Sequence, residues 1–261
     1  MKAILKYPGA KNRIADWICS YIPEHKVYLE PFAGSLAVLF AKPRCHIETV
    51  NDLDGEVVNF FRILREHPEE LRRKIELTPY SREEYFLACQ ETSDNIERAR
   101  RFCIRCWMGY GASIRYKNGF RSGQQSNSPN PAKAWAELPE RMKYAVERLK
   151  GVQIEQLPAA ELINRYNTKG VFIYADPPYL LETRNKKYLY RKEMSTEDHI
   201  QLLEMLSKHP GKVLLSGYEN SLYNDILKDW KKVKKKTVAD SGAKRIETLW
   251  MNYEIGQIQM F

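Results

Sequence analysis

The fold of this chain is indicated most clearly by one stretch, Val171-Phe172-Ile173-Tyr174-Ala175-Asp176-Pro177-Pro178-Tyr179. Residues 171–175 are continuously apolar, which is typical of a central parallel strand that is covered on both faces. The two prolines that follow lack a backbone N–H and have fixed φ angles, so the chain must leave the sheet there. The sequence therefore predicts a buried strand that ends in a rigid corner carrying a carboxylate, free carbonyl groups and an aromatic ring.

Strand and helix patterns alternate on both sides of this stretch. Further strands are indicated at Val27–Leu29, His46–Val50, 152–154, Val213–Leu215 and Thr248–Tyr253. Apolar residues at helical spacing indicate helices at 14–22, Leu36–Ala41, 57–64, 142–149, 195–206 and Leu222–Trp230. Ser195 and Asp198 form a plausible capping box at the start of one of them. This rhythm predicts an α/β fold with a Rossmann-like, mostly parallel sheet of about seven strands.

The alternation is interrupted once. Residues 67–135 contain Glu/Arg-rich helical patterns followed by the polar loop Gly119–Pro131, which is too hydrophilic for a core. We therefore expect a mainly helical subdomain at 67–135, inserted into a domain that residues 1–66 and 136–261 build together.

Composition excludes several classes of protein. The chain has 261 residues, of which 29% are charged and 43% hydrophobic, a balance that is typical of a globular protein and not of a disordered or fibrous one. Its longest weakly polar stretches, such as Ala33–Ala41, are far shorter than the roughly 20 residues that span a bilayer. The first residues lack the apolar region of a secretory signal. We expect no membrane association and a cytoplasmic location.

The five cysteines are scattered and odd in number, which favours reduced thiols. Cys103 and Cys106 form one CxxC pair, but no second pair or nearby histidine cluster completes four zinc ligands. Two buried thiols on a helix are favoured over a metal site, and we expect no metal.

The charge pattern points to a polyanionic partner. The net charge is +9, and Arg98–Arg121 holds seven Lys/Arg and no acid, with Trp107, Tyr110, Tyr116 and Phe120 among them. Such a combination suits phosphates and bases, although a solvated helix face is the alternative for an isolated basic run. Two more basic clusters lie at Arg184–Lys192 and Lys231–Lys236. The second of these also fits a charged edge strand that discourages aggregation.

The proline-held corner suits one reaction in particular. An exocyclic amine on a nucleobase is a poor nucleophile because its lone pair is delocalised into the ring. If Asp176 and the Pro177 carbonyl accept its two N–H bonds, the lone pair becomes localised for attack, and Tyr179 can stack on the ring. A paired base must first be extruded from the duplex. The alternative is a stiff turn that only ends the strand.

These motifs resemble those of the Dam-like, D12 class of S-adenosylmethionine-dependent DNA adenine-N6 methyltransferases. Asp176–Tyr179 resembles the catalytic motif, Lys6–Lys11 the amino-terminal cofactor motif, Glu30–Ser35 the first-strand motif and Asn51-Asp52 the acidic end of the second strand. The order of the motifs and of the insertion is also similar. The resemblance extends to Ser216–Tyr218 and Glu247–Asn252, and so covers nearly the whole chain.

The resemblance implies that S-adenosylmethionine is the cofactor. The implied cofactor-binding residues are Tyr7, Pro8, Gly9, Lys11, Pro31, Phe32, Ala33, Gly34, Ser35, Asp52, Gln156, Leu157 and Asp176. Asp52 would accept hydrogen bonds from the ribose hydroxyls; a helix N-cap is its alternative role, and Asp54 competes for the ribose. Lys11 would meet the methionine end, or is an exposed lysine at a helix start. The absence of GxGxxG argues against NAD.

The resemblance also assigns target recognition to the insertion at 67–135 and catalysis to the rest of the chain. The Asn118-Gly119 pair signals a hairpin flanked by arginine and aromatic residues. The candidate DNA-binding residues are Arg105, Arg115, Tyr116, Lys117, Asn118, Phe120, Arg121, Lys186 and Lys187. The arginines suit guanine or phosphate contacts, and Tyr116 or Phe120 suits the gap left by an extruded base. Arg184–Lys192 would be a mobile cover.

The predicted function is therefore methyl transfer from S-adenosylmethionine to N6 of a flipped adenine in double-stranded DNA, catalysed by Asp176, Pro177, Pro178 and Tyr179. N4-cytosine methylation is one alternative, and Asp in place of Ser at position 176 favours adenine by resemblance. A catalytically silent DNA-binding module is the other. We expect a monomer or weak dimer, acting in a bacterial or phage-infected cytoplasm.

Overall fold

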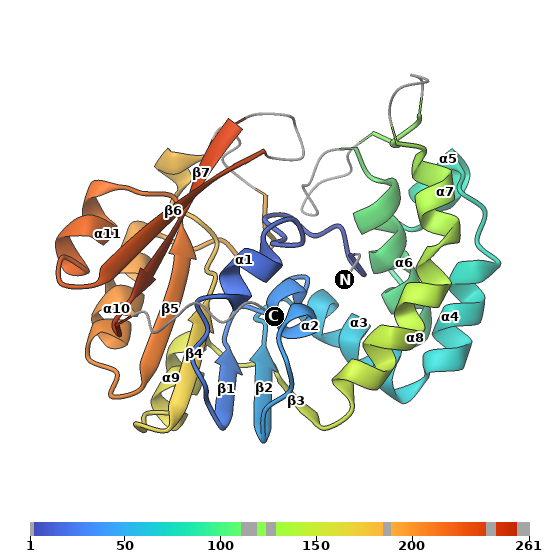
Figure 1. The fold of residues 1–261 in the computed structure, drawn as a ribbon. Coiled ribbons are helices and arrows are strands. Elements are labelled where there is room, and N and C mark those ends of the chain that lie inside the picture. The colour runs from blue at the N-terminus through green and yellow to red at the C-terminus, as the bar shows by residue number, and fades with distance from the viewer. Residues whose placement is uncertain (1–2, 111–118, 124–128, 185–188, 239–243, 255–261) are drawn as a thin grey trace.

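A computed structural model describes residues 3–110, 119–123, 129–184, 189–238 and 244–254, and its centre is one sheet (Figure 1). The strand order is β3-β2-β1-β4-β5-β7-β6. The strands are β1 (Val27–Glu30), β2 (Ile47–Asn51), β3 (Val152–Glu155), β4 (Val171–Ala175), β5 (Lys212–Gly217), β6 (Lys231–Val238) and β7 (Lys244–Met251). The pairings from β3 to β5 are parallel, and β7 is antiparallel to both β5 and β6. The predicted α/β fold with a mostly parallel sheet of about seven strands is confirmed.

Strand β4 is buried along its whole length, as its unbroken apolar sequence predicts. Val171, Ile173 and Ala175 join a core cluster that includes residues of α9 (Ala159–Arg165), α10 (Thr196–Ser207) and α11 (Ser221–Ile226). Phe172 and Tyr174 join the larger cluster that the amino-terminal segments share with the remaining helices. Because neither face of β4 is in contact with solvent, its sequence does not alternate between apolar and polar residues.

The strand order places a topological switch between β1 and β4. The chain runs outward from β1 through β2 to β3, then crosses back to place β4 on the other side of β1. Ligands of open α/β sheets bind at the carboxyl ends of strands where the order reverses. The segments that follow Glu30 and Ala175 therefore meet at the expected binding position.

Helices gather on two sides of the sheet (Figure 1). Helices α9 and α10 lie beside β4 and β5, and α11 lies next to α10. The others are α1 (Ala15–Cys19), α2 (Ala37–Ala41), α3 (Gly55–Glu66), α4 (Pro68–Glu76), α5 (Arg82–Leu87), α6 (Asn95–Met108), α7 (Pro131–Ala136) and α8 (Leu138–Leu149). The predicted capping box of α10 is confirmed, because Ser195 Oγ accepts the N–H of Asp198 at 3.1 Å and the Asp198 carboxylate accepts the N–H of Ser195 at 2.8 Å.

Helices α4 to α8 form a helical body at one end of the molecule (Figure 1). It is anchored by two buried tryptophans: Trp107 Nε1 donates to the Ile4 carbonyl and Trp135 Nε1 to the Thr78 carbonyl, each at 2.9 Å. Helix α8 packs against α4, so the helical body continues past the predicted boundary at residue 135. The division of the chain into a catalytic and a target-recognition part stays a prediction.

Strand β6 forms the outer edge of the sheet and contains Lys231–Lys236. Lys232 and Lys234 both pair with Glu219, which follows β5. This placement agrees with the edge-strand interpretation of the cluster, since charged side chains on an edge oppose pairing with another sheet.

Candidate active site

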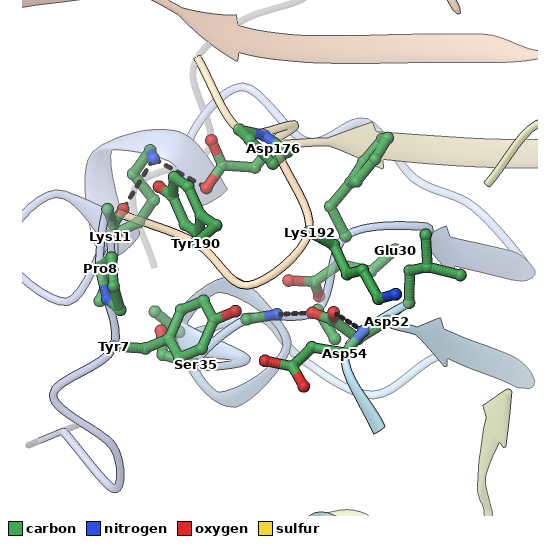
Figure 2. A pocket seen from close by; sticks show the side chains of 18 of the residues that line it. Tyr7, Pro8, Lys11, Glu30, Ser35, Asp52, Asp54, Asp176, Tyr190 and Lys192 are labelled. Carbon is green, nitrogen blue, oxygen red and sulfur yellow. Dashed lines mark hydrogen bonds and ion pairs between the residues drawn. The ribbon is translucent and has the colours of Figure 1, made fainter. Parts of the chain in front are cut away.

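A pocket of about 750 Å³, counted with the open space at its mouth, lies at the carboxyl ends of β1 and β4 (Figure 2). We call it the β1–β4 pocket. Of the residues predicted from the sequence it is lined by Tyr7, Pro8, Gly9, Lys11, Phe32, Ala33, Gly34, Ser35, Asp52, Asp176 and Pro178. Most of the predicted cofactor set and the corner after β4 therefore share one cavity, whose size suits a small-molecule ligand.

The turn after β1 has an unusual backbone. Gly34 has φ +47°, and a Cβ placed on it would lie 3.2 Å from the Tyr7 ring. Leu36, two residues later and fully buried, also adopts a left-handed conformation with φ 56°. Such a conformation costs a non-glycine residue free energy and is found mostly at binding and catalytic sites. The turn brings the Gly34 N–H to the pocket wall, where it donates to Asp52 Oδ2 at 2.8 Å.

Two carboxylates, Asp52 and Asp54, follow β2 and line the pocket. Asp52 Oδ1 accepts the N–H of Asp54 at 2.9 Å, and burial raises the pKa of Asp52 to about 6. Asp54 Oδ1 caps α3 by accepting the Glu56 N–H at 3.0 Å. The N-cap role considered for Asp52 thus belongs to Asp54, and Asp52 remains the carboxylate without a helix to cap.

Asp176 is held from two sides at the corner after β4. Its Oδ1 accepts the Ser216 hydroxyl at 2.7 Å, and its Oδ2 accepts the Lys11 ammonium at 2.7 Å. Lys11 also donates to the Gly9 carbonyl at 2.9 Å and is only 6% exposed. The alternative of an exposed lysine at a helix start is therefore wrong. Burial alone would lower the pKa of Lys11, but the carboxylates of Asp176 and Glu247 outweigh it and raise that pKa.

Tyr179 is buried beside Asp176 but does not line the pocket, and neither does Pro177. The Tyr179 hydroxyl donates to the Glu247 carboxylate, and its ring meets the Tyr218 ring edge-on at 4.6 Å between centroids. The Lys11 ammonium lies 4.8 Å from the Tyr179 ring centroid. Stacking of Tyr179 on a nucleobase stays a prediction.

Three members of the predicted cofactor set, Pro31, Gln156 and Leu157, lie outside the pocket lining. Asn51 connects two of them, since its amide donates to the Pro31 carbonyl at 2.9 Å and its Oδ1 accepts the Leu157 N–H at 2.8 Å. Gln156 is exposed and lies beside Gly55. These residues join the ends of β1, β2 and β3, and their contact with a cofactor stays a prediction.

Sequence reasoning missed part of the pocket. Glu30, at the end of β1, is a buried lining residue that accepts the Tyr28 hydroxyl at 2.7 Å, and burial raises its pKa to about 8. Glu30 is the first residue of the first-strand motif Glu30–Ser35, but the predicted cofactor-binding set did not include it. Tyr190 covers Gly9 so closely that a Cβ on this glycine would collide with its hydroxyl.

The segment with Tyr190 lies across the pocket, and Lys192, Glu193 and Met194 also line it (Figure 2). Glu193 pairs with Arg184 at 2.6 Å and accepts the backbone N–H of Tyr190 at 3.0 Å. Residues of the predicted cover thus reach the pocket. Lys186 and Lys187, the candidate DNA contacts of this segment, lie outside the described residues.

The base of the predicted hairpin is present in the helical body. Gly109 and Phe120 form an antiparallel bridge, flanked by hydrogen bonds from Tyr110 N to Gly119 O at 2.6 Å and from Arg121 N to Met108 O at 2.7 Å. The remaining hairpin candidates Arg115, Tyr116, Lys117 and Asn118 lie outside the described residues.

Two other candidate DNA contacts are engaged within the protein. Phe120 packs against Tyr80 at the hairpin base with ring centroids 5.2 Å apart, and its role as a wedge stays a prediction. Arg105 pairs with Glu56 of α3 at 2.5 Å and donates to the Ala88 carbonyl at 2.6 Å. These partners are supplied by neighbouring helices that the basic run does not reveal, and a contact of Arg105 with DNA stays a prediction.

Other arginines of α6 are also paired. Arg98 binds Glu56, Arg100 binds Glu84 and Glu97, and Arg101 binds Glu97. The helical part of the basic run is therefore an ion-paired surface within the helical body. Cys103 and Cys106 are both buried on this helix, and burial raises the pKa of Cys106 to about 12. In the part of the chain that the structure describes, no cluster of three His, Cys, Asp or Glu side chains could hold a metal.

No helix among the described segments combines the length and the apolar character needed to cross a membrane.

Comparison with known proteins identifies the family of this chain. Residues 7–240 match the family of D12 class N6 adenine-specific DNA methyltransferases. The chain is similar to the Type II methyltransferase M1.LlaDCHI of Lactococcus lactis subsp. cremoris, with 27% identity over 269 residues that cover 94% of this chain and 90% of that protein. It is 24% identical to a DNA adenine methylase of Vibrio cholerae over 220 residues, covering 79% of this chain and 76% of that protein.

Among solved structures, a SAM-dependent methyltransferase from Agrobacterium tumefaciens aligns with a TM-score of 0.38 and 9% identity, over 92% of this chain and 60% of that one. The family match runs from Tyr7 at the pocket, through the turn at Gly34 and the corner at Asp176, as far as residue 240. The chain therefore belongs to the D12 class of N6 adenine-specific DNA methyltransferases and is an adenine-specific DNA methyltransferase.

Proposed function

We propose that this protein transfers a methyl group from S-adenosylmethionine to N6 of an adenine that has been extruded from duplex DNA. The observation that carries the proposal is that Asp176, at the corner after β4, lines the same pocket as Gly34 and Asp52. An acceptor for the amino group and the predicted cofactor-binding residues are thus neighbours. The family identification supports S-adenosylmethionine as the cofactor that the sequence motifs imply.

The pocket chemistry fits this cofactor. Asp52, Asp54 and Asp176 all line the pocket, and these carboxylates suit a ligand that carries a sulfonium and an ammonium charge. Asp52 can accept hydrogen bonds from ribose hydroxyls, and Gly34 lets the backbone approach a ligand closely. When bound, S-adenosylmethionine supplies an activated methyl group on sulfur.

The residues at the corner would prepare the amine. Asp176 and the Pro177 carbonyl can accept the two N–H bonds of the amino group, which localises the nitrogen lone pair. Ser216 fixes the Asp176 carboxylate through Oδ1, so its orientation is set before the base arrives. The reaction then needs positioning and amine polarisation more than acid–base chemistry. A base within the duplex cannot reach this corner, so the target adenine must first be extruded from the duplex.

Product analysis tests the proposal. The purified protein is incubated with S-adenosylmethionine and unmethylated duplex DNA, and the DNA is digested to nucleosides for mass spectrometry. N6-methyl-2′-deoxyadenosine is expected. N4-methyl-2′-deoxycytidine would support the alternative base, and binding of DNA without any methylated product would support the silent DNA-binding module. Long-read mapping of the modified adenines would then give the recognition sequence.

Arg121 offers a test of the docking surface. Arg121→Gln is expected to weaken binding to all duplexes about equally and to reduce the slope of log K against log salt by about 0.9, as the loss of one phosphate contact would. The arginine follows the hairpin base, where its Nε donates to the Gly109 carbonyl at 3.2 Å. Fluorescence anisotropy at several salt concentrations measures the slope.

Arg165→Gln is the matched control, because Arg165 is an exposed, ion-paired arginine on α9, at the other end of the molecule from the hairpin base (Figure 1). It should leave the slope unchanged. A loss confined to one DNA sequence would assign Arg121 to base readout, and no change at all would remove it from the interface.

A further inference from the structure

A second buried carboxylate stands next to the proposed catalytic corner. Glu247 lies on β7, the antiparallel neighbour of β5, and its side chain is only 5% exposed. It does not line the β1–β4 pocket. A carboxylate so far removed from water is costly unless hydrogen bonds or an opposite charge compensate it, so its partners indicate its role.

Those partners are the residues that surround Asp176. The Tyr179 hydroxyl donates to the Glu247 carboxylate, and the Lys11 ammonium lies 3.8 Å from Glu247 Oε1. The same ammonium lies 2.7 Å from Asp176 Oδ2. One buried ammonium is therefore shared unequally between two carboxylates, and the nearer of these is the proposed acceptor for the target amine.

This arrangement creates competition at Asp176. Ser216 donates to Oδ1 and Lys11 donates to Oδ2, so an incoming amino group must donate to an oxygen that already accepts one hydrogen bond. An ammonium bound tightly to Asp176 also withdraws electron density from the group that must polarise the amine. Lys11 can loosen its contact only if another negative charge is within reach, because an unpaired buried ammonium is strongly unfavourable.

We propose that Glu247 is a positioning residue for methyl transfer, which gives Lys11 a second carboxylate so that the ammonium can shift toward β7 when the target amine hydrogen-bonds to Asp176. This inference rests on the proposed function and adds to it a residue outside the pocket. The hydrogen bond from Tyr179 fixes the Glu247 carboxylate while Lys11 moves. No covalent step is assigned to Glu247.

The charge state of Glu247 makes the inference testable by pH. The groups that face it are Lys11 from the amino-terminal loop, Tyr174, Asp176 and Tyr179 from β4 and its corner, Tyr218 after β5, and Lys235 opposite it on β6. Lys235 places its ammonium over the Trp17 ring, 5.4 Å from the centroid. Burial, with a smaller contribution from Asp176, raises the pKa of Glu247 to about 7 although Lys11 and Tyr179 oppose this.

The sign of the pH effect follows. Above its pKa Glu247 is ionised and can attract Lys11; below it the neutral carboxyl leaves Lys11 to Asp176. The single-turnover methylation rate of the wild type, with cofactor and DNA saturating, should therefore fall about tenfold per pH unit below about pH 7. Asp52 should not cause this fall in rate, because the saturating cofactor is already bound to it under the proposed function.

Glu247→Gln separates charge from shape. It keeps the size of the side chain and an oxygen that can accept the Tyr179 hydroxyl, but it cannot ionise. We expect a single-turnover rate about 10- to 100-fold below wild type at about pH 8, loss of the limb near neutral pH, and little change in the cofactor dissociation constant. Glu161→Gln, which neutralises an ion-paired acid on α9, should retain the wild-type rate and profile.

A double-mutant cycle tests whether Glu247 acts through Lys11. In a Lys11→Met background, Glu247→Gln should change the rate by less than about twofold, since residues that act as one unit show non-additive effects. Multiplying effects, or an unchanged pH profile in Glu247→Gln, would overturn the inference. Thermal melting shows whether Glu247→Gln folds. If it does not, Lys11→Met is tested alone. A pH profile of Lys11→Met that still falls below about pH 7 would contradict the proposal. A wild type that methylates no base at any pH would instead refute the proposed function, and this inference with it.

Discussion

Asp176→Ala is expected to lower the single-turnover rate of DNA methylation by about 10³-fold or more, while the cofactor dissociation constant changes by only a few-fold. Asp176 is the one side-chain acceptor in the corner after β4 that the proposed mechanism places on the target amine. Loss of a single preorganised group that stabilises developing charge costs about 10²- to 10³-fold in comparable sites. The substitution also removes the nearer of the two carboxylates that pair with the buried Lys11 ammonium, which adds to the loss.

Asp176→Asn sharpens the test. The asparagine has the same shape and can still accept the Ser216 hydroxyl, but its other terminal atom is an amide nitrogen that donates toward Lys11. A rate as low as that of Asp176→Ala would show that the acceptor and its charge matter, not the volume.

Rapid-quench methylation assays measure the rate, and titration calorimetry with S-adenosylmethionine measures the affinity. Asp225→Ala is the control, since Asp225 is an exposed acid on α11 and should keep the wild-type rate. A rate for Asp176→Ala within about threefold of wild type would remove the amine-polarising corner from the mechanism.

The corner itself was predictable because its causes are local. An unbroken apolar run forms a strand buried on both faces, and two prolines end that strand, whatever the rest of the chain does. The capping box of Ser195 and Asp198 is local in the same way. Features of this kind can be predicted from the neighbouring residues alone.

The charge partners were not predictable, because they join distant parts of the chain. Lys11 and Asp176 are 165 positions apart, and nothing near Lys11 in the sequence indicates that it is buried against a carboxylate. Arg105 belongs to a basic run without acids, yet it is paired with Glu56 of α3, 49 positions away. Charge patterns show how much charge a segment carries but not which charges from other segments face it.

The strand order was predictable only in part. The alternation of helices and strands predicts a parallel sheet, but the antiparallel insertion of β7 between β5 and β6 has no local signal. That insertion is what brings Glu247 next to Lys11 and Tyr179. Part of the site is therefore a consequence of topology, which no single motif encodes.

Asp52→Asn is expected to weaken S-adenosylmethionine binding by roughly 2–4 kcal/mol, about 30- to 1,000-fold. Two charge-assisted hydrogen bonds to ribose hydroxyls account for a loss of this size. Asp54→Asn is the matched comparison, because asparagine is as good an N-cap as aspartate and should preserve the start of α3. If Asp54→Asn loses the affinity and Asp52→Asn does not, the ribose contact belongs to Asp54.

The pH dependence of binding gives a second readout of Asp52. Burial raises its pKa to about 6 in the cofactor-free protein, and the ionised form is the better acceptor for ribose hydroxyls. Affinity should be constant above that pKa and fall as the pH drops through it, by up to about tenfold per unit, because protonation removes acceptor sites from the carboxylate. Calorimetric titrations between about pH 5 and 8 would measure this. In Asp52→Asn the dependence should vanish, and a curve that keeps its wild-type shape would assign the titrating group elsewhere, with Glu30 at the end of β1 as the next carboxylate to replace.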